Sequence, residues 1–301
     1  MENTQAYANS RLSYQIPRRR LIQITGRDGK IISAVLHLPL NQEKPKGLAA
    51  LIPGWSGDRC GPAELLREIA DAAALAGCAA LRFDFLSRGD SGGYSGEFGL
   101  DMMVANTVDA LEAVRPEFPG ARIHLAGICS GGNVALGAAS LLLNDVSTVA
   151  GLSTLPFQEH AGAEMRTARR KKHVITVSSR LLKWSTWKKI FSGGVDYRRA
   201  LSGFSGKESN APADGGERNP KRASWNILEK LSGWKGNCLM IYGGLDAEGT
   251  AARKIFSSVW PKSLRPIDFH IVPESNHNYY SYESQREAVQ KTIAQFISEN
   301  K

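Results

Sequence analysis

Residues 121–136 constrain the fold most, because they combine an apolar strand, a glycine-flanked turn and a helix rich in alanine and leucine. Within the turn, Gly127, Cys129 and Gly131 follow the spacing Gly-x-nucleophile-x-Gly. A strained backbone at the centre of such a turn lets one side chain project freely, provided that its neighbours are small. The central residue is Cys129, and Ser130 lies one place out of register. The segment therefore predicts an acyl-transfer enzyme whose nucleophile is sulfur.

A cysteine is more often a small buried apolar residue than a nucleophile, so the partners of Cys129 decide between the two interpretations. The first candidate partner is an acid. Residues 237–243 are typical of a buried strand, and Asp246 comes just after its C-terminal end. Catalytic groups of open parallel sheets lie at those carboxyl ends. Glu248 is an alternative acid, and Asp246 is also placed to cap the helix that follows.

The second candidate partner is a histidine. Residues 267–273 alternate like a strand, His277 lies in the loop after them, and residues 284–300 are typical of an amphipathic closing helix. Of the other histidines, we expect His270 within the sheet and His173 in a basic segment. His277 is therefore the expected general base.

These three residue types work together in nucleophilic catalysis. The thiolate is the attacking form of a cysteine, and a nearby imidazole or a helix N-terminus favours it. His277 would take the thiol proton and later protonate the leaving group, while Asp246 would hold the imidazole in one tautomer. The chemistry needs no cofactor. The four cysteines show neither metal-ligand spacing nor a disulfide framework, so we expect no metal site.

An oxyanion hole would complete such a site. One expected donor is the backbone N–H of Ser130, and the other is that of Trp55, in the loop after the strand at residues 47–52. Gly54 would let this backbone approach the substrate. Losing one such donor costs about 3–4 kcal/mol of transition-state stabilisation. The side chain of Trp55 either walls the acyl pocket or covers the core.

The rest of the pattern alternates strands with helices, which favours a mostly parallel sheet covered on both faces. The further expected strands lie at residues 21–25, 31–38, 78–83 and 148–152, and the further expected helices at 64–76 and 101–114.

A second motif carries a resemblance to a known family. The segment Leu81–Gly93, with Asp84, Asp90 and Ser91, resembles the signature RFDxxGxGxS of serine aminopeptidase-like and dienelactone hydrolase-like proteins. Over nearly its whole length the chain resembles the α/β-hydrolase superfamily, and residues 181–196 resemble the exosortase-associated hydrolases. The resemblance implies an α/β-hydrolase fold with a helical lid insertion. We expect Asp84 and Asp90 to hold their loop through hydrogen bonds.

Two features depart from the common esterase pattern. The nucleophile position holds Cys129, as it does in dienelactone hydrolases, and Pro53-Gly54 replaces the usual His-Gly before the oxyanion donor. Both leave the expected fold unchanged and argue against ordinary esterase activity.

The pattern breaks between residues 158 and 235, so we expect a core of residues 1–157 and 236–301 interrupted by a lid. Residues 160–235 hold 17 Lys or Arg against 6 Asp or Glu, so this segment exceeds the +9 net charge of the whole chain. Trp184 and Trp187 are expected substrate-binding residues of the lid, and residues 202–222 an expected mobile loop. A basic lid attracts anionic partners such as a coenzyme A or acyl-carrier-protein thioester, although a solvated basic face is the more common explanation of such charge.

Other features exclude some classes of protein. No recognised nucleic-acid motif accompanies the basic charge, and no apolar run approaches membrane-spanning length. The first residues lack a signal-peptide pattern, so we expect a cytoplasmic protein. Three functions remain: hydrolysis of an ester, lactone or thioester through an acyl-cysteine, transfer or cyclisation through the same intermediate, and non-catalytic binding. Class frequency favours hydrolysis.

Overall fold

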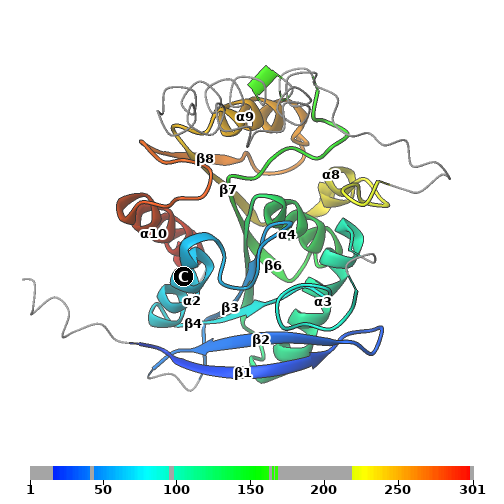
Figure 1. The fold of residues 1–301 in the computed structure, drawn as a ribbon, viewed down its shortest axis with the longest axis vertical. Coiled ribbons are helices and arrows are strands. Elements are labelled where there is room, and N and C mark those ends of the chain that lie inside the picture. Colours follow the sequence, from blue (N-terminus) through cyan, green and yellow to red (C-terminus); the bar gives the residue numbers. More distant parts are fainter. Residues whose placement is uncertain are drawn as a thin grey trace, which may run out of the picture.

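A computed structural model describes residues 16–40, 44–94, 98–162, 165, 167–168 and 219–298. Its described residues form an eight-stranded sheet with the order β1-β2-β4-β3-β5-β6-β7-β8 (Figure 1). The strands are β1 Arg18–Thr25, β2 Ile31–Leu38, β3 Gly47–Ile52, β4 Cys78–Phe83, β5 Arg122–Ile128, β6 Val146–Leu152, β7 Asn237–Gly243 and β8 Asp268–Val272. The main helices are α2 Leu65–Leu75, α3 Leu100–Val114, α4 Ser130–Leu141, α8 Ile227–Lys230, α9 Ala247–Val259 and α10 Tyr282–Ser298.

The sheet is mostly parallel. Strands β4, β3, β5, β6, β7 and β8 run parallel to one another, whereas β2 pairs antiparallel with both β1 and β4. Because parallel neighbours point the same way, the loops after β3, β5, β6, β7 and β8 leave from one edge of the sheet. This arrangement confirms the expected α/β-hydrolase fold.

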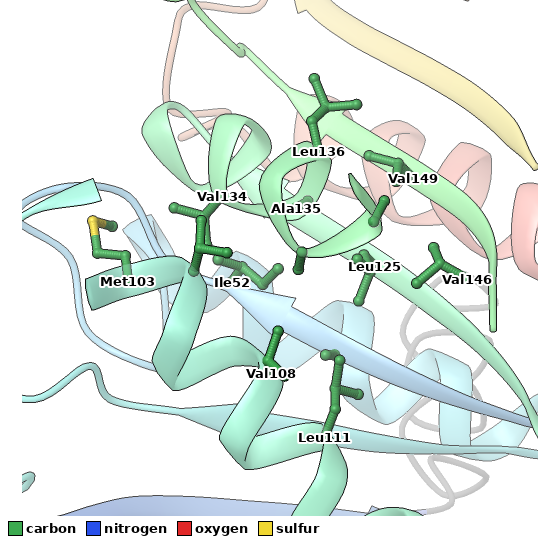
Figure 2. Packing of buried hydrophobic residues seen from close by; sticks show 14 of the residues in the cluster. Ile52, Met103, Val108, Leu111, Leu125, Val134, Ala135, Leu136, Val146 and Val149 are labelled. Atoms are coloured by element: carbon green, nitrogen blue, oxygen red, sulfur yellow. The ribbon is translucent and has the colours of Figure 1, made fainter. Parts of the chain in front are cut away.

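Helices cover both faces of the sheet, as the alternation of side chains requires. In β3, Leu48, Ala50 and Ile52 join one apolar cluster, and the intervening Ala49 and Leu51 join a second. The first cluster is closed by α3, α4 and α9, and the second by α2 and α10 (Figure 1). Figure 2 shows the first cluster, with side chains of α3 and α4 packed around residues of β3, β5 and β6. Strands buried on both faces are continuous apolar runs for this reason.

Two boundaries differ from expectation. Strand β1 begins at Arg18 rather than at residue 21, because its first three residues pair with Leu36–Leu38 of β2. The helix expected at 64–76 begins at Leu65, after a turn at Pro62–Glu64 in which Ala63 and Glu64 have positive φ angles of 47° and 62°. A left-handed backbone cannot continue an α-helix, so the turn delays its start.

A buried polar cluster joins β2, β4 and α2. His37 Nδ1 donates to Asp71 Oδ1 at 2.7 Å, Arg82 Nε donates to His37 Nε2 at 2.9 Å, and Arg19 Nε donates to Asp71 Oδ1 at 3.1 Å. Burial lowers the pKa of His37 and outweighs its hydrogen bond to Asp71. Burial raises the pKa of Asp71, but the hydrogen bonds from His37 and Arg19 lower it more. The cluster accounts for charged residues inside otherwise apolar elements.

Most of the expected lid, including Trp184 and Trp187, lies outside the described residues. The C-terminal part of that region lies on the main core, where Ile227 and Leu231 contact α4 residues. The indole of Trp234 donates to Val146 O at 2.7 Å, and that of Trp225 to Ser140 Oγ at 3.3 Å. Within the described ranges, no helix combines the length and apolar character needed to cross a membrane.

Candidate active site

Cys129 occupies a sharp turn between β5 and α4. Its backbone has φ 56° and ψ −120°, a conformation that costs a non-glycine residue energy and persists only where its surroundings enforce it. Two hydrogen bonds do so here: Cys129 N donates to Leu152 O at 2.8 Å, and Gly132 N donates to Cys129 O at 3.2 Å. The thiol therefore stands at the carboxyl end of β5 and the N-terminus of α4.

Gly127 shows why the turn needs small residues. A Cβ added there would overlap Gly131 O and would lie 2.6 Å from Gly132 N. No side chain fits between the last residues of β5 and the first turn of α4. The spacing of glycines around Cys129 therefore reflects the close packing of two backbone segments.

Asp246 and His277 meet at the same edge of the sheet. Asp246 follows β7 and His277 follows β8, and the two loops are tied together by Leu245 N donating to Ser275 O at 2.9 Å. His277 Nδ1 lies 2.7 Å from Asp246 Oδ2, and the carboxylate is almost fully buried. Asp246 also caps α9, because its Oδ1 accepts from Glu248 N at 3.2 Å. The carboxylate thus both contacts the imidazole and caps the helix, the two arrangements considered from the sequence.

The imidazole also interacts with the side chain of Cys129, whose hydrogen bond and charge act on the pKa of His277. Burial lowers the pKa of His277, but the hydrogen bonds to Asp246 and Cys129, together with their charges, raise it to about 9. The three expected catalytic side chains thus form one continuous chain of contacts. His270, by contrast, lies within β8 with its Nε2 2.6 Å from Glu287 Oε1.

The loop after β3 lies directly against the nucleophile turn. A Cβ added at Gly54 would lie 3.2 Å from Ile128 O and 3.4 Å from Cys129 Cβ, so glycine permits this approach. The indole of Trp55 stacks edge-on against Phe98 at 4.8 Å between ring centroids. Trp55, the residue after Gly54, and Ser130, the residue after Cys129, both line the cavity beside the thiol.

The motif after β4 fastens this loop in place. Asp84 is fully buried and accepts from Arg59 N at 2.7 Å, from the Arg59 guanidinium and from Asp90 N at 3.0 Å. Arg59 also pairs with the Asp90 carboxylate, and Arg88 Nε donates to Trp55 O at 3.4 Å. The expectation that Asp84 and Asp90 hold the loop through hydrogen bonds matches these contacts.

A cavity of about 150 Å³ opens beside Cys129. Its other lining residues include Trp55, Ser130, Asn133 and Leu155, so the Trp55 side chain walls the cavity as well as contacting Phe98. Within the part of the chain that the structure describes, no three His, Cys, Asp or Glu residues are grouped to hold a metal.

Three further residues at this edge were not predicted from the sequence. Asn133 stands four residues after Cys129, a spacing that places both on one side of a helix and could have indicated it. Lys221 also lines the cavity, but it comes from a distant segment and carries no sequence signal. Tyr279 is fully buried two residues after His277, and its hydroxyl donates to Ile241 O at 2.8 Å and accepts from Ser153 Oγ at 3.1 Å. Tyr279 thereby anchors the His277 loop to β7.

Comparison with known families identifies the family of the chain. The alpha/beta hydrolase family matches residues 50–291, a range that includes Cys129, Asp246 and His277. The chain belongs to the alpha/beta hydrolase family. No curated protein matches this hydrolase sequence.

Solved alpha/beta hydrolase structures share its fold at low sequence identity. A dienelactone hydrolase from Anabaena variabilis is 15% identical, with a TM-score of 0.60 over 95% of this chain and 99% of that chain. An esterase from Pyrococcus furiosus is 14% identical, with a TM-score of 0.63 over 95% and 94%. Est1E from Butyrivibrio proteoclasticus, solved with ferulic acid, is 16% identical, with a TM-score of 0.60 over 92% and 99%. At these identities the similarity concerns the fold.

Proposed function

We propose that this hydrolase cleaves an ester, lactone or thioester through an acyl-Cys129 intermediate. The observation that carries the proposal is the unbroken contact from Cys129 through His277 to Asp246, at the carboxyl edge of the sheet. Ser130 is a poorer nucleophile candidate, because its Oγ is inaccessible and has no hydrogen-bond partner among the described residues.

The first half-reaction follows from these positions. The Cys129 sulfur attacks the carbonyl carbon, and the carbonyl oxygen becomes an oxyanion between the N–H groups of Trp55 and Ser130. Collapse of this intermediate breaks the bond to the leaving oxygen or sulfur, which takes the proton from the His277 imidazolium. A His277 pKa of about 9 keeps the imidazole protonated for this task at neutral pH.

The second half-reaction needs the opposite protonation state. Acylation removes the charge and the hydrogen bond of Cys129, which are two of the causes that raise the His277 pKa. The pKa of His277 therefore falls in the acyl-enzyme, and the neutral imidazole can take a proton from water as water attacks the thioester. Collapse returns the sulfur to its starting state and releases the acid.

Transfer to another acceptor is the second candidate function, favoured specifically by sulfur at residue 129. A thioester reacts with amines more readily, relative to water, than an oxygen ester does, so an acceptor amine, hydroxyl or carbon could replace water. The basic residues of 160–235 would then attract a coenzyme A or acyl-carrier-protein thioester. A non-catalytic binding module is disfavoured, because binding alone needs no contact between a thiol, an imidazole and a carboxylate.

Three finer expectations belong to the same proposal. The serine aminopeptidase-like or exosortase-associated branch is proposed from the motif at Leu81–Gly93 and from residues 181–196. A lid at 158–235, with Trp184 and Trp187 contacting substrate, is proposed from the break in pattern. A reducing, cytoplasmic location would keep the four free cysteines as thiols.

Intact-protein mass spectrometry tests the proposal. The protein is incubated with a panel of acyl thioesters and activated esters, alongside Cys129→Ala and the control Cys60→Ala, which removes the other partly exposed cysteine. We expect an acyl adduct on the wild type and on Cys60→Ala, and none on Cys129→Ala. Turnover by Cys129→Ala at the wild-type rate would refute the nucleophile. Adding an amine to the trapped adduct then separates hydrolysis from transfer.

A further inference from the structure

A second groove lies at the amino-terminal edge of the sheet, opposite the edge that carries Cys129. It has a volume of about 560 Å³ and opens beside the first residues of β5 and β6 and the segments that precede β7 and β8. Strand β5 runs from Arg122 at this groove to Ile128 at the nucleophile turn, a span of about 20 Å at the usual rise of a strand. The groove is therefore separate from the acyl cavity, and the proposed reaction does not use it.

The lining of this groove is strongly basic. Its charged residues are Arg115, Arg122, Lys235, Arg265 and Asp145, so four cations from four separate segments converge on it with one carboxylate. Three of the cations lie outside residues 160–235, in the part of the chain that is slightly acidic as a whole, so overall composition does not explain them. Like charges gathered in one groove repel each other, and a bound anion would relieve that repulsion.

The one carboxylate of the lining is engaged by Arg115. The two terminal nitrogens of Arg115 donate to the two oxygens of Asp145 at 2.9 Å and 2.6 Å, which fixes this guanidinium at the groove. Arg265 is oriented by an uncharged group instead, because its Nη1 donates to Asn237 Oδ1 at 2.9 Å. An amide orients a guanidinium without cancelling its charge, so the field of Arg265 remains in the groove.

The segments that carry Lys235 and Arg265 are held in place by two tryptophans. The indole of Trp234, next to Lys235, donates to Val146 O at 2.7 Å. The indole of Trp260 donates to Arg265 O at 2.9 Å. Both cations consequently stand on backbone that is already ordered, and an anion that binds between them pays less for ordering its site.

The types of cation favour phosphate as the ligand group. A guanidinium presents a planar fork of N–H donors that matches phosphate oxygens, and an ammonium adds a compact charge. We propose that this groove binds a small molecule with two or more phosphate groups, and that Arg265 and Lys235 contact them. The site is a second one, independent of Cys129 and of the acyl group that it carries.

Isothermal titration calorimetry with pyrophosphate tests the proposal in a buffer of low salt without other multivalent anions. The double variant Lys235→Gln with Arg265→Gln removes two charges from the groove. The matched control, Arg253→Gln with Lys254→Gln, removes two charges from exposed residues of α9 that do not line the groove. We expect the wild type and the control to bind pyrophosphate with similar Kd values, and the groove variant to bind about tenfold more weakly or worse. Lys235→Gln alone keeps the contact between Arg265 and Asn237, and should already weaken binding.

Three outcomes would overturn the proposal. If the wild type does not bind pyrophosphate at millimolar concentration, the groove is not a phosphate site. If both double variants bind equally weakly, pyrophosphate responds to the net charge of the protein and not to this groove. If citrate, which carries carboxylates, binds more tightly than pyrophosphate, the ligand class is wrong. Acylation of Cys129 is measured separately by mass spectrometry, so failure of either proposal leaves the other in place.

Discussion

His277 Nδ1 lies 2.7 Å from Asp246 Oδ2, while the other oxygen of the same carboxylate accepts the Glu248 N–H at 3.2 Å. The carboxylate is therefore held on both sides, by the helix that it caps and by the imidazole that it orients. Asp246 Oδ2 accepts a hydrogen bond from the Nδ1–H group, so Nε2 is the ring nitrogen left to face Cys129.

This relationship predicts a strong effect of Asp246→Asn on turnover. Asparagine keeps the helix cap, but its carboxamide can present an N–H to Nδ1 and favour the wrong tautomer. We expect kcat to fall by about 10³–10⁴-fold with little loss of thermal stability. Steady-state kinetics and thermal unfolding measure the two quantities. The matched control is Glu248→Gln, which should change kcat by less than about tenfold; a larger loss there would make Glu248 the acid.

The pKa of His277 predicts an alkaline limit on acylation. The imidazolium that protonates the leaving group is lost as the pH rises through about 9, so the single-turnover acylation rate should fall above that value. Asp246→Asn removes one of the charges that raise this pKa, so the fall in the acylation rate should begin at lower pH in the variant. If the rate falls at the same pH in both proteins, another group titrates.

The same pKa makes a prediction about stability. His277 has a folded-state pKa of about 9, above its ordinary value of 6.5, so the folded state binds its proton more tightly. This contribution is fully present below pH 6.5 and is lost as the pH rises through about 9. The free energy of unfolding from urea titrations should therefore fall between pH 6.5 and pH 9.5. His277→Gln should show a smaller fall, and an equal fall would contradict the prediction.

The buried cluster around His37 predicts acid sensitivity. Its folded-state pKa is lowered, so the unfolded chain binds a proton that the folded chain does not as the pH drops through 6.5. Asp71, whose pKa is lowered as well, adds a loss of stability at more acidic pH. Unfolding free energy should fall from pH 7 to pH 5, less steeply in His37→Gln, which retains a donor and an acceptor without a proton to gain. Parallel slopes would place the acid sensitivity elsewhere.

The close packing of the nucleophile turn predicts intolerance of a single methyl group. Gly127→Ala places a Cβ against the backbone of Gly131 and Gly132, and should reduce stability by about 3 kcal/mol or more. At Gly162 an added Cβ meets nothing within 4 Å, so Gly162→Ala should stay within about 0.5 kcal/mol of wild type. Chemical denaturation measures both, and similar values would contradict the packing argument.

Local patterns were sufficient to predict much of the fold. Residues 121–136 form a strand, a turn and a helix because glycine spacing and apolar content are local properties, and family matching confirms the fold that they indicated. The predicted start of the helix at residue 64 was one residue too early, because Ala63 and Glu64 adopt positive φ angles. Neither residue type favours that conformation, so the sequence does not indicate it. The antiparallel placement of β2 against β4 depends on packing between distant segments and has no local signature.

The candidate site shows the same division. Cys129, Asp246 and His277 each follow a strand, so their positions along the chain indicated that they would share one edge of the sheet. The residues that line the cavity could not be predicted from the sequence. Lys221 belongs to a segment far along the chain, and the unpartnered Oδ1 atom of Asn133 is seen only in the structure. The contact from Tyr279 to Ile241 likewise depends on a tertiary fit that no spacing encodes.

The position of His277 after β8, at the outer edge of the sheet, also sets the order in which the site is assembled during synthesis. Cys129 emerges from the ribosome before Asp246 and His277 have been synthesised. The strand that precedes the thiol, β5, lies in the interior of the sheet. Until β7 and β8 add to its edge, a nascent or partly folded chain presents an ordinary cysteine without a base. Under the proposed mechanism, acylation of Cys129 would therefore report that the last strand has docked, and an acylating probe would count completely folded molecules.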